Sequence, residues 1–307
     1  MTALKISLIS AVKNESKYIN ACLDSILSQV DTSWFEYEVV VVDDNSNDET
    51  FELVRDSYLL DERIFCFRSP GSGKCAAYNY AFSRCSGDFI FIFAGDDLLP
   101  VNSLSLRLRS IINYCDTNSF DWKSIPVAQF SKMRTFSENM TLNDKILPPA
   151  FVPLGNTSGA TTLLNKKAAD LIFPIPEMLK SEDGWTALCI DNFMRSYHLP
   201  LVTYIYRIHL NNSVPYARGF AEYRLYLLER LRVYELFERL RGNCLDDVQA
   251  SKVNQHVKLY SSFKDSNMLG IVHSNVPLAL RIKCLAFSSR IIYAAVYVCY
   301  KLRVITL

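Results

Sequence analysis

The sequence predicts an α/β fold, with a mostly parallel sheet flanked by helices and a helical region at the C-terminal end. Short apolar runs alternate with segments of helical apolar spacing between residues 4 and 110. Two acidic pairs each stand just after such a run: Asp43-Asp44 and Asp96-Asp97. A parallel sheet buries its strands on both faces, and residues just past the strands' carboxyl ends line the ligand crevice. The alternation therefore favours right-handed crossovers, and the acids mark a candidate site.

Each expected element follows from its own residues. Apolar runs predict strands at 5–10, 39–42, 64–67, 88–93 and 201–209. Apolar residues three or four positions apart predict helices at 16–29, through 51–54, and at 73–85, 182–197 and 220–241. Asn47 or Asp48 is expected to cap the second helix. Between 111 and 180 the pattern weakens and prolines mark loops, which suits a substrate-binding half.

The composition fits a globular protein in a reducing compartment. The chain has 307 residues, 50% hydrophobic and 21% charged, which allows a sizeable core. Its net charge of +1 gives no reason to expect nucleic-acid binding. The nine cysteines are scattered without a C-x-x-C pair, as is typical of reduced thiols. Lys5 precedes an apolar run that indicates a strand and not a secretory signal, so we expect a cytoplasmic protein.

Several sequence blocks occur in a characteristic order. The chain opens with ISLISAVKNESKYINACLDSILSQ and YEVVVVDDNSNDET, continues with GKCAAYNYAFSRCSGDFIFIFAGDDLLP, and later contains SEDGW and YRIHLNNS. In this order the blocks resemble the family 2 glycosyltransferases over residues 4–213. The resemblance implies a GT-A fold in 1–213, with a nucleotide-binding half (1–110) and an acceptor-binding half (111–213), and leaves 214–307 as a helical C-terminal region. It also implies an inverting transferase that moves a sugar from a nucleotide-sugar, expected to be a UDP-sugar, to a hydroxyl of a glycan acceptor.

The resemblance assigns the first acidic pair to the nucleotide. Asp44 matches the family aspartate that recognises the nucleobase, usually uracil, and Asp43 lies beside it. Lys13 stands where the family often has a tyrosine next to the nucleotide, and Lys74 would meet phosphate charge. The alternative is that the Asp-Asp-Asn-Ser turn caps the next helix and that the lysines lie on solvated faces.

The resemblance assigns the second acidic pair to a metal ion. Asp96 and Asp97 match the family's D-x-D region, although Ala94 replaces its usual first acid. Hard oxygen ligands suit manganese or magnesium, which would offset charge on the leaving nucleoside diphosphate, and Asp96 would also contact the ribose. His209 would ligate the metal or touch the diphosphate, although a lone histidine is as often structural. A solvated loop is the alternative for the pair.

A third acidic pair, Glu182-Asp183, would carry the chemistry. Asp183 matches the catalytic base of inverting members, which takes a proton from the acceptor hydroxyl as its oxygen attacks the anomeric carbon. Glu182 would support it, and Trp185 would stack on the acceptor sugar. Acids at a helix start also interact favourably with the helix dipole, so a purely structural role is the alternative.

The C-terminal segment 276–307 is apolar, aromatic and purely basic. All acidic residues lie at or before Asp265, and five basic residues follow it. The longest uncharged stretch, 291–300, has ten residues, against about 20 for a membrane span. We expect a helix lying in the membrane interface with Lys and Arg meeting anionic lipid, which would make the protein peripheral on the inner face of the cell membrane. The alternative is a terminal helix docked on the catalytic domain or on a second copy of the chain.

Such a tail would suit a lipid-linked glycan acceptor in surface polysaccharide synthesis, for example of O-antigen. Two other classes stay open. A nucleotidyltransferase would share the sheet and the metal-binding acids but would use a nucleoside triphosphate. A non-catalytic nucleotide-sugar-binding or scaffold protein would fit the departures from the family pattern at Lys13 and Ala94.

Overall fold

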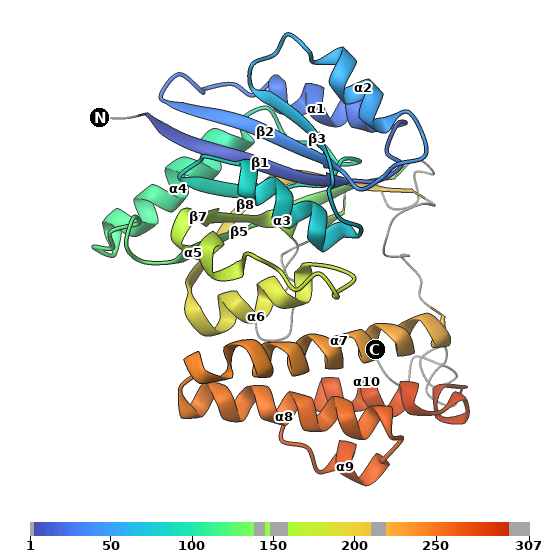
Figure 1. Ribbon diagram of the computed structural model, residues 1–307. Coiled ribbons are helices and arrows are strands. Elements are labelled where there is room, and N and C mark those ends of the chain that lie inside the picture. The colour runs from blue at the N-terminus through green and yellow to red at the C-terminus, as the bar shows by residue number, and fades with distance from the viewer. Residues whose placement is uncertain (1–2, 138–144, 148–158, 210–218, 295–307) are drawn as a thin grey trace. The chain divides into compact units, whose positions relative to one another are not determined.

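The computed structural model describes residues 3–137, 145–147, 159–209 and 219–294 (Figure 1). The chain divides into two compact units, Met1–Asn212 and Ser213–Leu307. The first unit contains the sheet and all the candidate carboxylates, and the described part of the second is helical.

One eight-stranded sheet forms the centre of the first unit, in the order β3-β2-β1-β4-β7-β5-β6, with β8 also pairing with β5. The strands are β1 (Leu4–Val12), β2 (Phe35–Asp43), β3 (Ile64–Arg68), β4 (Phe89–Ile92), β5 (Val127–Ser137), β6 (Ile146–Leu147), β7 (Thr162–Asn165) and β8 (Arg195–Ile208). Strands β3, β2, β1 and β4 pair in parallel, as do β5 and β8. Strand β7 pairs antiparallel with both β4 and β5, and β6 pairs antiparallel with β5. The mostly parallel α/β sheet predicted from the sequence is confirmed.

Helices cover both faces of this sheet (Figure 1). They are α1 (Ile19–Leu27), α2 (Thr50–Ser57), α3 (Lys74–Arg84), α4 (Ser103–Thr117), α5 (Lys166–Ile172) and α6 (Asp183–Phe193), with the short 3₁₀ turn η1 (Gly159–Thr161) before β7. On one face, alternate β1 residues such as Ile6 and Leu8 pack with Leu23 of α1 and Leu108 of α4 in one apolar core. On the other face, α3 packs against β1 and β2 through small buried residues such as Ala77. Burial on both faces explains the unbroken apolar runs.

Most expected elements of the first hundred residues are confirmed. Strands β1, β2 and β3 are longer than the apolar runs indicate and β4 is shorter, while α1 and α3 are shorter than the expected helices. The prediction that Asn47 or Asp48 caps α2 was partly wrong. Glu49 is the N-cap residue and its side chain makes no capping hydrogen bond. Asp48 nevertheless binds the first turn, since its Oδ1 accepts a hydrogen bond from Thr50 N at 3.0 Å. The helix expected at 182–197 ends at Phe193 because the chain extends into β8 from Arg195, where it pairs with β5. The strand expected at 201–209 therefore begins earlier, at Arg195.

The second unit is described from residue 219 to 294. It contains α7 (Phe220–Arg241), the 3₁₀ turn η2 (Gly242–Cys244), α8 (Asp247–Lys264), α9 (Met268–Val272) and α10 (Leu278–Ser288). The bounds expected for the first of these helices are confirmed. Helices α7 and α8 pack together, for example through the ring of Tyr234 stacked on His256 at 4.8 Å. No helix among the described residues is long and apolar enough to cross a membrane, and residues 295–307 of the expected tail lie outside them.

Candidate active site

The strand order defines a crevice at the carboxyl ends of β1 and β4. From β1 the chain runs to β2 and β3 on one side, and α3 then carries it back to β4 on the other side of β1 (Figure 1). The connections therefore proceed across the sheet in opposite directions from β1. The place where they diverge, between the parallel strands β1 and β4, is the topological switch point at which open α/β sheets bind ligands. The three acidic pairs are held at or near this edge.

The first pair closes β2. Asp43 is completely buried and pairs in the sheet with Val12, and its Oδ2 accepts from Ser46 N at 3.1 Å. Asp44 is buried as well, and its Oδ1 accepts the backbone N–H of Gly73 at 2.8 Å. Lys13 Nζ lies 3.5 Å from Asp44 Oδ2, on a side chain that is 53% exposed. Neither aspartate caps α2, because that helix begins after Glu49.

The second pair follows β4 and separates into two environments. Asp97 is 2% exposed, and both of its carboxylate oxygens accept bonds from β8: Oδ2 from the Tyr204 hydroxyl at 2.8 Å and Oδ1 from Arg207 N at 2.7 Å. Burial, and then the charge of Asp96, raise the pKa of Asp97 well above its ordinary value. Asp96 Oδ2 instead lies 3.0 Å from His209 Nε2. Both acids are therefore buried but have different partners: Asp97 binds Tyr204 and Arg207 of β8, and Asp96 meets His209.

Glu15, which the sequence reasoning missed, lies beside this second pair. Burial, followed by the charges of Asp96 and Asp48, raises the pKa of Glu15 to about 8. Gly95 permits the close approach, since a Cβ there would stand 2.7 Å from Val12 Cγ1 and 3.5 Å from Glu15 Cγ. The signal that could have found it was its place just after the first strand, at the same sheet edge as the aspartates.

The donor set near Asp96 fits a divalent cation only in part. No group of three or more His, Cys, Asp or Glu residues gathers as a metal site within the described part of the chain. Asp96 Oδ2 and His209 Nε2 stand 3.0 Å apart, close enough to bind one ion together. Asp97 is less available, because the fold occupies both of its oxygens. A cation here would have two protein ligands and would need further oxygens from a ligand or water.

The third pair begins α6. Glu182 is 3% exposed, and its Oε1 lies 3.0 Å from Lys74 Nζ, while its Oε2 has no hydrogen-bond partner. Asp183 is partly exposed and its Oδ1 lies 3.4 Å from the backbone N–H of Gly159. Lys74, expected at donor phosphates, is thus directed to Glu182. Tyr206 of β8 lies within electrostatic range of both the second and the third acidic pair. Burial, and then the charges of Asp97, Asp96 and Asp183, raise the pKa of Tyr206 to about 12, whereas the charge of Lys74 acts to lower it.

Trp185 does not lie where the sequence placed it. Its side chain is 1% exposed, and its Nε1 donates to the carbonyl oxygen of Ile172 at 2.8 Å. A ring that is buried in the core cannot stack on an acceptor sugar. The prediction was wrong because the i, i+2 step from Asp183 turns the side chain to the opposite side of α6, toward α5.

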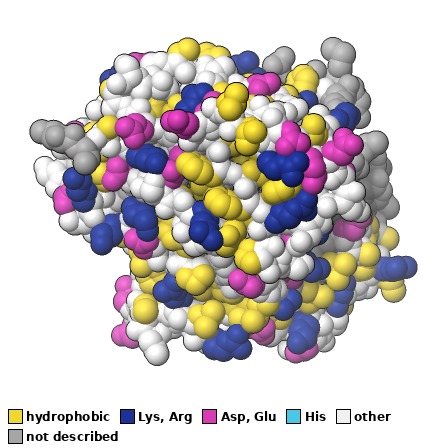
Figure 2. Space-filling model, turned by 45° about the horizontal axis from the view of Figure 1, so that its top comes forward, with side chains coloured by type: hydrophobic (Ala, Val, Ile, Leu, Met, Phe, Trp, Pro, Cys, Tyr) yellow, Lys and Arg dark blue, Asp and Glu magenta, His cyan; other side chains and the backbone are white. Residues whose placement is uncertain are grey.

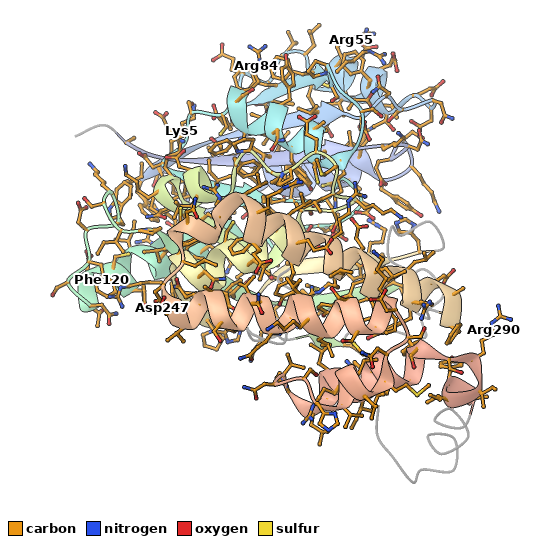
Figure 3. All side chains as sticks on the ribbon, turned by 60° about the horizontal axis from the view of Figure 1, so that its bottom comes forward. Lys5, Arg55, Arg84, Phe120, Asp247 and Arg290 are labelled. Carbon is orange, nitrogen blue, oxygen red and sulfur yellow. The ribbon has the colours of Figure 1, made fainter. Side chains whose placement is uncertain are left out.

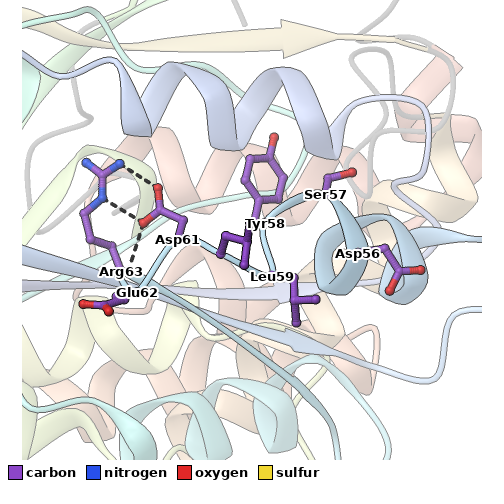
Figure 4. A pocket seen from close by; sticks show the side chains of 8 residues that line it. Asp56, Ser57, Tyr58, Leu59, Asp61, Glu62 and Arg63 are labelled. Atoms are coloured by element: carbon purple, nitrogen blue, oxygen red, sulfur yellow. Dashed lines mark hydrogen bonds and ion pairs between the residues drawn. The ribbon is translucent and has the colours of Figure 1, made fainter.

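A surface hollow lined by residues 56–63 belongs to a different edge of the molecule. It lies in the connection between α2 and β3, where Arg63 binds Asp61, as Figure 4 shows. Since β3 begins at Ile64, the hollow stands at the amino ends of the parallel strands, away from the carboxylates. Figure 2 shows acidic and basic side chains interspersed over one face of the molecule, without a broad field of one sign.

Comparison with known proteins finds a matching family and several similar glycosyltransferases. Residues 7–173 match the family model of the glycosyl transferase family 2. Glycosyltransferase GlyA of Streptococcus pneumoniae is 30% identical over 110 residues, which cover 36% of this chain and 15% of GlyA. A putative teichuronic acid biosynthesis glycosyltransferase of Bacillus subtilis, TuaG, is 26% identical over 145 residues, 46% of this chain and 56% of TuaG. The chain thus corresponds to a part of each of these relatives.

Solved structures share the fold. S. aureus TarS 1-349 in complex with UDP-GlcNAc has a TM-score of 0.56 and 21% identity, covering 93% of this chain and 79% of that one. The mannosyltransferase PcManGT of Pyrobaculum calidifontis, in complex with GDP-Man and Mn²⁺, has a TM-score of 0.59 and 15% identity, covering 100% of this chain and 82% of that one. Because the family match spans more than half of its residues and the fold agrees with the GT-A structures, this chain belongs to the glycosyl transferase family 2.

Proposed function

We propose that this protein is an inverting glycosyltransferase that moves a sugar from a nucleotide-sugar, most simply a UDP-sugar, to a hydroxyl of a glycan. The observation that carries the proposal is a physical link between two sides of the crevice. Gly73 donates its backbone N–H to Asp44, and the next residue, Lys74, pairs with Glu182 beside Asp183. A nucleobase at Asp44 and an acceptor at Asp183 would therefore share one connected site.

The donor side would consist of the residues that follow β1 and β2. Asp44 would recognise the base, with Asp43 holding the turn through Ser46. Lys13 is half exposed beside Asp44 and would meet a nucleotide phosphate. Binding of UDP-GlcNAc by TarS supports a uracil nucleotide, and binding of GDP-Man by PcManGT makes guanine the competing base.

A divalent cation, Mn²⁺ or Mg²⁺, would be held by Asp96 and His209 together with the donor's diphosphate. When bound, it would neutralise charge on the leaving nucleoside diphosphate. Asp97 would act through the fold, fixing the loop to Tyr204 and Arg207. The Mn²⁺ in the PcManGT structure supports such a cation.

Asp183 would take the proton from the acceptor hydroxyl while that oxygen attacks the anomeric carbon from the face opposite the leaving group. The displacement is a single step, so the configuration at that carbon inverts. The partial exposure of Asp183 leaves it accessible to an acceptor, whereas the buried Glu182 is not. The name of TuaG, a putative teichuronic acid biosynthesis glycosyltransferase, supports a role in polysaccharide synthesis. The product would be a surface polysaccharide such as O-antigen, and the acceptor a lipid-linked glycan.

The second unit would bring the enzyme to the membrane. Exposed apolar side chains gather on α9 and α10, namely Met268, Leu269, Val272, Leu278 and Ile282. The exposed bases Lys283 and Arg290 accompany them, and Figure 3 shows the Arg290 side chain extending away from the ribbon. Asp265, just before α9, is the last acid of the chain. An apolar surface with bases suits an anionic lipid bilayer.

Vesicle co-sedimentation tests this membrane contact. The full chain should sediment with vesicles of mixed anionic and zwitterionic lipid, and Leu269→Gln with Ile282→Gln should lose most of that binding. Leu60→Gln is the matched control, because Leu60 is 93% exposed but lines the hollow at residues 56–63 together with three acids. Equal binding by all three proteins would contradict the assignment.

Thermal stabilisation by nucleotides tests the donor site. A ligand that binds only the folded state raises Tm by mass action. At a ligand concentration of a hundred times Kd, the free energy of unfolding increases by about 2.7 kcal/mol. We expect UDP or a UDP-sugar to raise Tm in a Mn²⁺-dependent way. Asp44→Ala should lose the rise in Tm with nucleotide, and Asp96→Ala should lose the dependence of that rise on Mn²⁺. Asp170→Asn, at a surface ion pair with Lys166, is the control. A rise in Tm only with nucleoside triphosphates would indicate a nucleotidyltransferase. Nucleotide binding without sugar transfer to any glycan would indicate a non-catalytic scaffold protein.

A further inference from the structure

An ion pair between a buried glutamate and a lysine whose side chain is 36% exposed stands next to the proposed catalytic base. Lys74, the first residue of α3, places its Nζ 3.0 Å from Glu182 Oε1. The Glu182 side chain is 4% exposed, and its second carboxylate oxygen has no hydrogen-bond partner. Although burial disfavours its charge, Lys74 has a pKa well above its ordinary value because Glu182, Tyr78 and Asp183 favour the cation. Lys74 is therefore charged over the whole working pH range.

The groups that face this pair explain why a cation is needed. Glu182 and Asp183 are adjacent carboxylates, and like charges at close range repel each other. Lys74 Nζ lies 5.6 Å from the ring centroid of Tyr78, which is buried, and Tyr206 is partly buried; both are phenols that carry no charge at neutral pH. Lys74 supplies positive charge to this acidic pair.

The backbone fixes where this cation can stand. Gly73 has φ of 100°, a conformation that residues with a side chain rarely adopt, and it donates its N–H to Asp44 Oδ1 at 2.8 Å. The start of α3 is thereby tied to the carboxyl end of β2. Lys74 reaches Glu182 from a tethered position, and a flexible surface lysine would not hold the pair so firmly.

We infer that Lys74 is a positioning residue that holds Glu182 and keeps the neighbouring Asp183 ionised as the base, and that its role is not to bind donor phosphate. This inference rests on the proposed transferase function. Removing the lysine would leave Glu182 as an uncompensated buried charge beside Asp183, and the proton affinity of both acids would rise. Replacing Glu182 by a neutral isostere would remove the excess charge.

The pH profile of transfer tests the inference. In Lys74→Met the acid limb of kcat/KM should move to higher pH by roughly one unit or more, the range in which a lost opposite charge acts. Activity at pH 6 should then fall about tenfold further than activity at pH 9. Lys74→Arg should keep the wild-type profile, and Lys74→Met with Glu182→Gln should move the limb back. A loss that is equal at every pH, or a raised KM for the donor with an unmoved limb, would overturn the inference in favour of phosphate binding.

A second readout separates this inference from the proposed function. When the pKa of an acid is higher in the folded than in the unfolded state, the protein loses stability as pH rises between those two pKa values. Lys74→Met should therefore lose more Tm at pH 8 than at pH 5, and adding Glu182→Gln should remove the pH dependence. If the wild-type protein transfers no sugar but this pattern appears, the proposed function fails and the ion pair stands. A loss of Tm in Lys74→Met that does not vary with pH, and that the added Glu182→Gln substitution leaves unchanged, would overturn the assignment of the ion pair itself.

Discussion

The carboxyl ends of β2 and β4 each contain two adjacent aspartates, but the two ends are built differently. At β2, Asp43 and Asp44 are held by backbone N–H groups of Ser46 and Gly73, which stand within about thirty residues along the chain. At β4, Asp97 is held by Tyr204 and Arg207, more than a hundred residues later. One end is a local turn, and the other is closed only when β8 pairs with β5.

This difference shows how adjacent acids divide their work. At β4, Asp97 gives both oxygens to the fold while Asp96 meets His209 at the crevice. The same division recurs at α6, where Glu182 is buried against Lys74 and Asp183 is partly exposed. A pair thus lets one carboxylate anchor the loop that presents the other.

The sharpest test of that division is at α6. Asp183→Asn should lower kcat by roughly 10²–10⁴-fold, because the amide cannot accept the acceptor proton, while the thermal shift with nucleotide should stay within about 1 °C of wild type. Glycan transfer and nucleotide-dependent Tm measure the two effects. Comparable activity in Asp183→Asn and wild type would remove Asp183 from the role of base.

The second test compares the two acids at β4. Asp97→Ala should lower the free energy of unfolding by roughly 2–4 kcal/mol, because it leaves the Tyr204 hydroxyl and the Arg207 amide without their buried partner. Asp96→Ala should cost less than Asp97→Ala, because it loses the contact with His209 but also removes the repulsion of Asp97 and Glu15, and it should abolish the Mn²⁺-dependent stabilisation. Urea unfolding of both variants, with and without Mn²⁺, makes the comparison. Equal stability losses would show that the two carboxylates do not divide their roles.

The same comparison explains what the sequence could predict. The strands β1 to β4 and the acids after them were predictable, because burial on both faces leaves continuous apolar runs and a parallel sheet aligns their carboxyl ends. The partners of Asp97 were not, since Tyr204 and Arg207 give no sign in the sequence of pairing with residues so distant. Strands β5 and β7 were missed because their apolar pattern is weak, and helix α4 was missed although Leu104, Leu108 and Ile111 stand at helical spacing. Burial of Trp185 likewise depends on α5, which periodicity did not reveal.

Glu15 provides the finest test, because it stands between the two ends being compared. Its backbone N–H donates to Thr50 Oγ1 at 2.8 Å on the β2 side, while its carboxyl group faces Asp96 on the β4 side. Burial and then the charges of Asp96 and Asp48 raise its folded pKa to about 8, from an ordinary value of 4.5. The folded protein therefore keeps a proton that the unfolded chain releases, and stability contributed at pH 4.5 is lost as pH rises toward 8.

Glu15→Gln is permanently neutral and should escape this loss. We expect it to match wild type near pH 5 and to exceed it by on the order of 1 kcal/mol at pH 8, a figure reduced for the carboxyl group's partial exposure. Urea midpoints at pH 5, 6, 7 and 8 in chelator measure the difference, and Glu62→Gln, exposed at the opposite edge of the sheet, should run parallel to wild type. Adding Mn²⁺ should narrow the gap, because a cation at Asp96 favours ionised Glu15. A gap that is constant with pH would mean that the β2 and β4 ends do not meet electrostatically at Glu15.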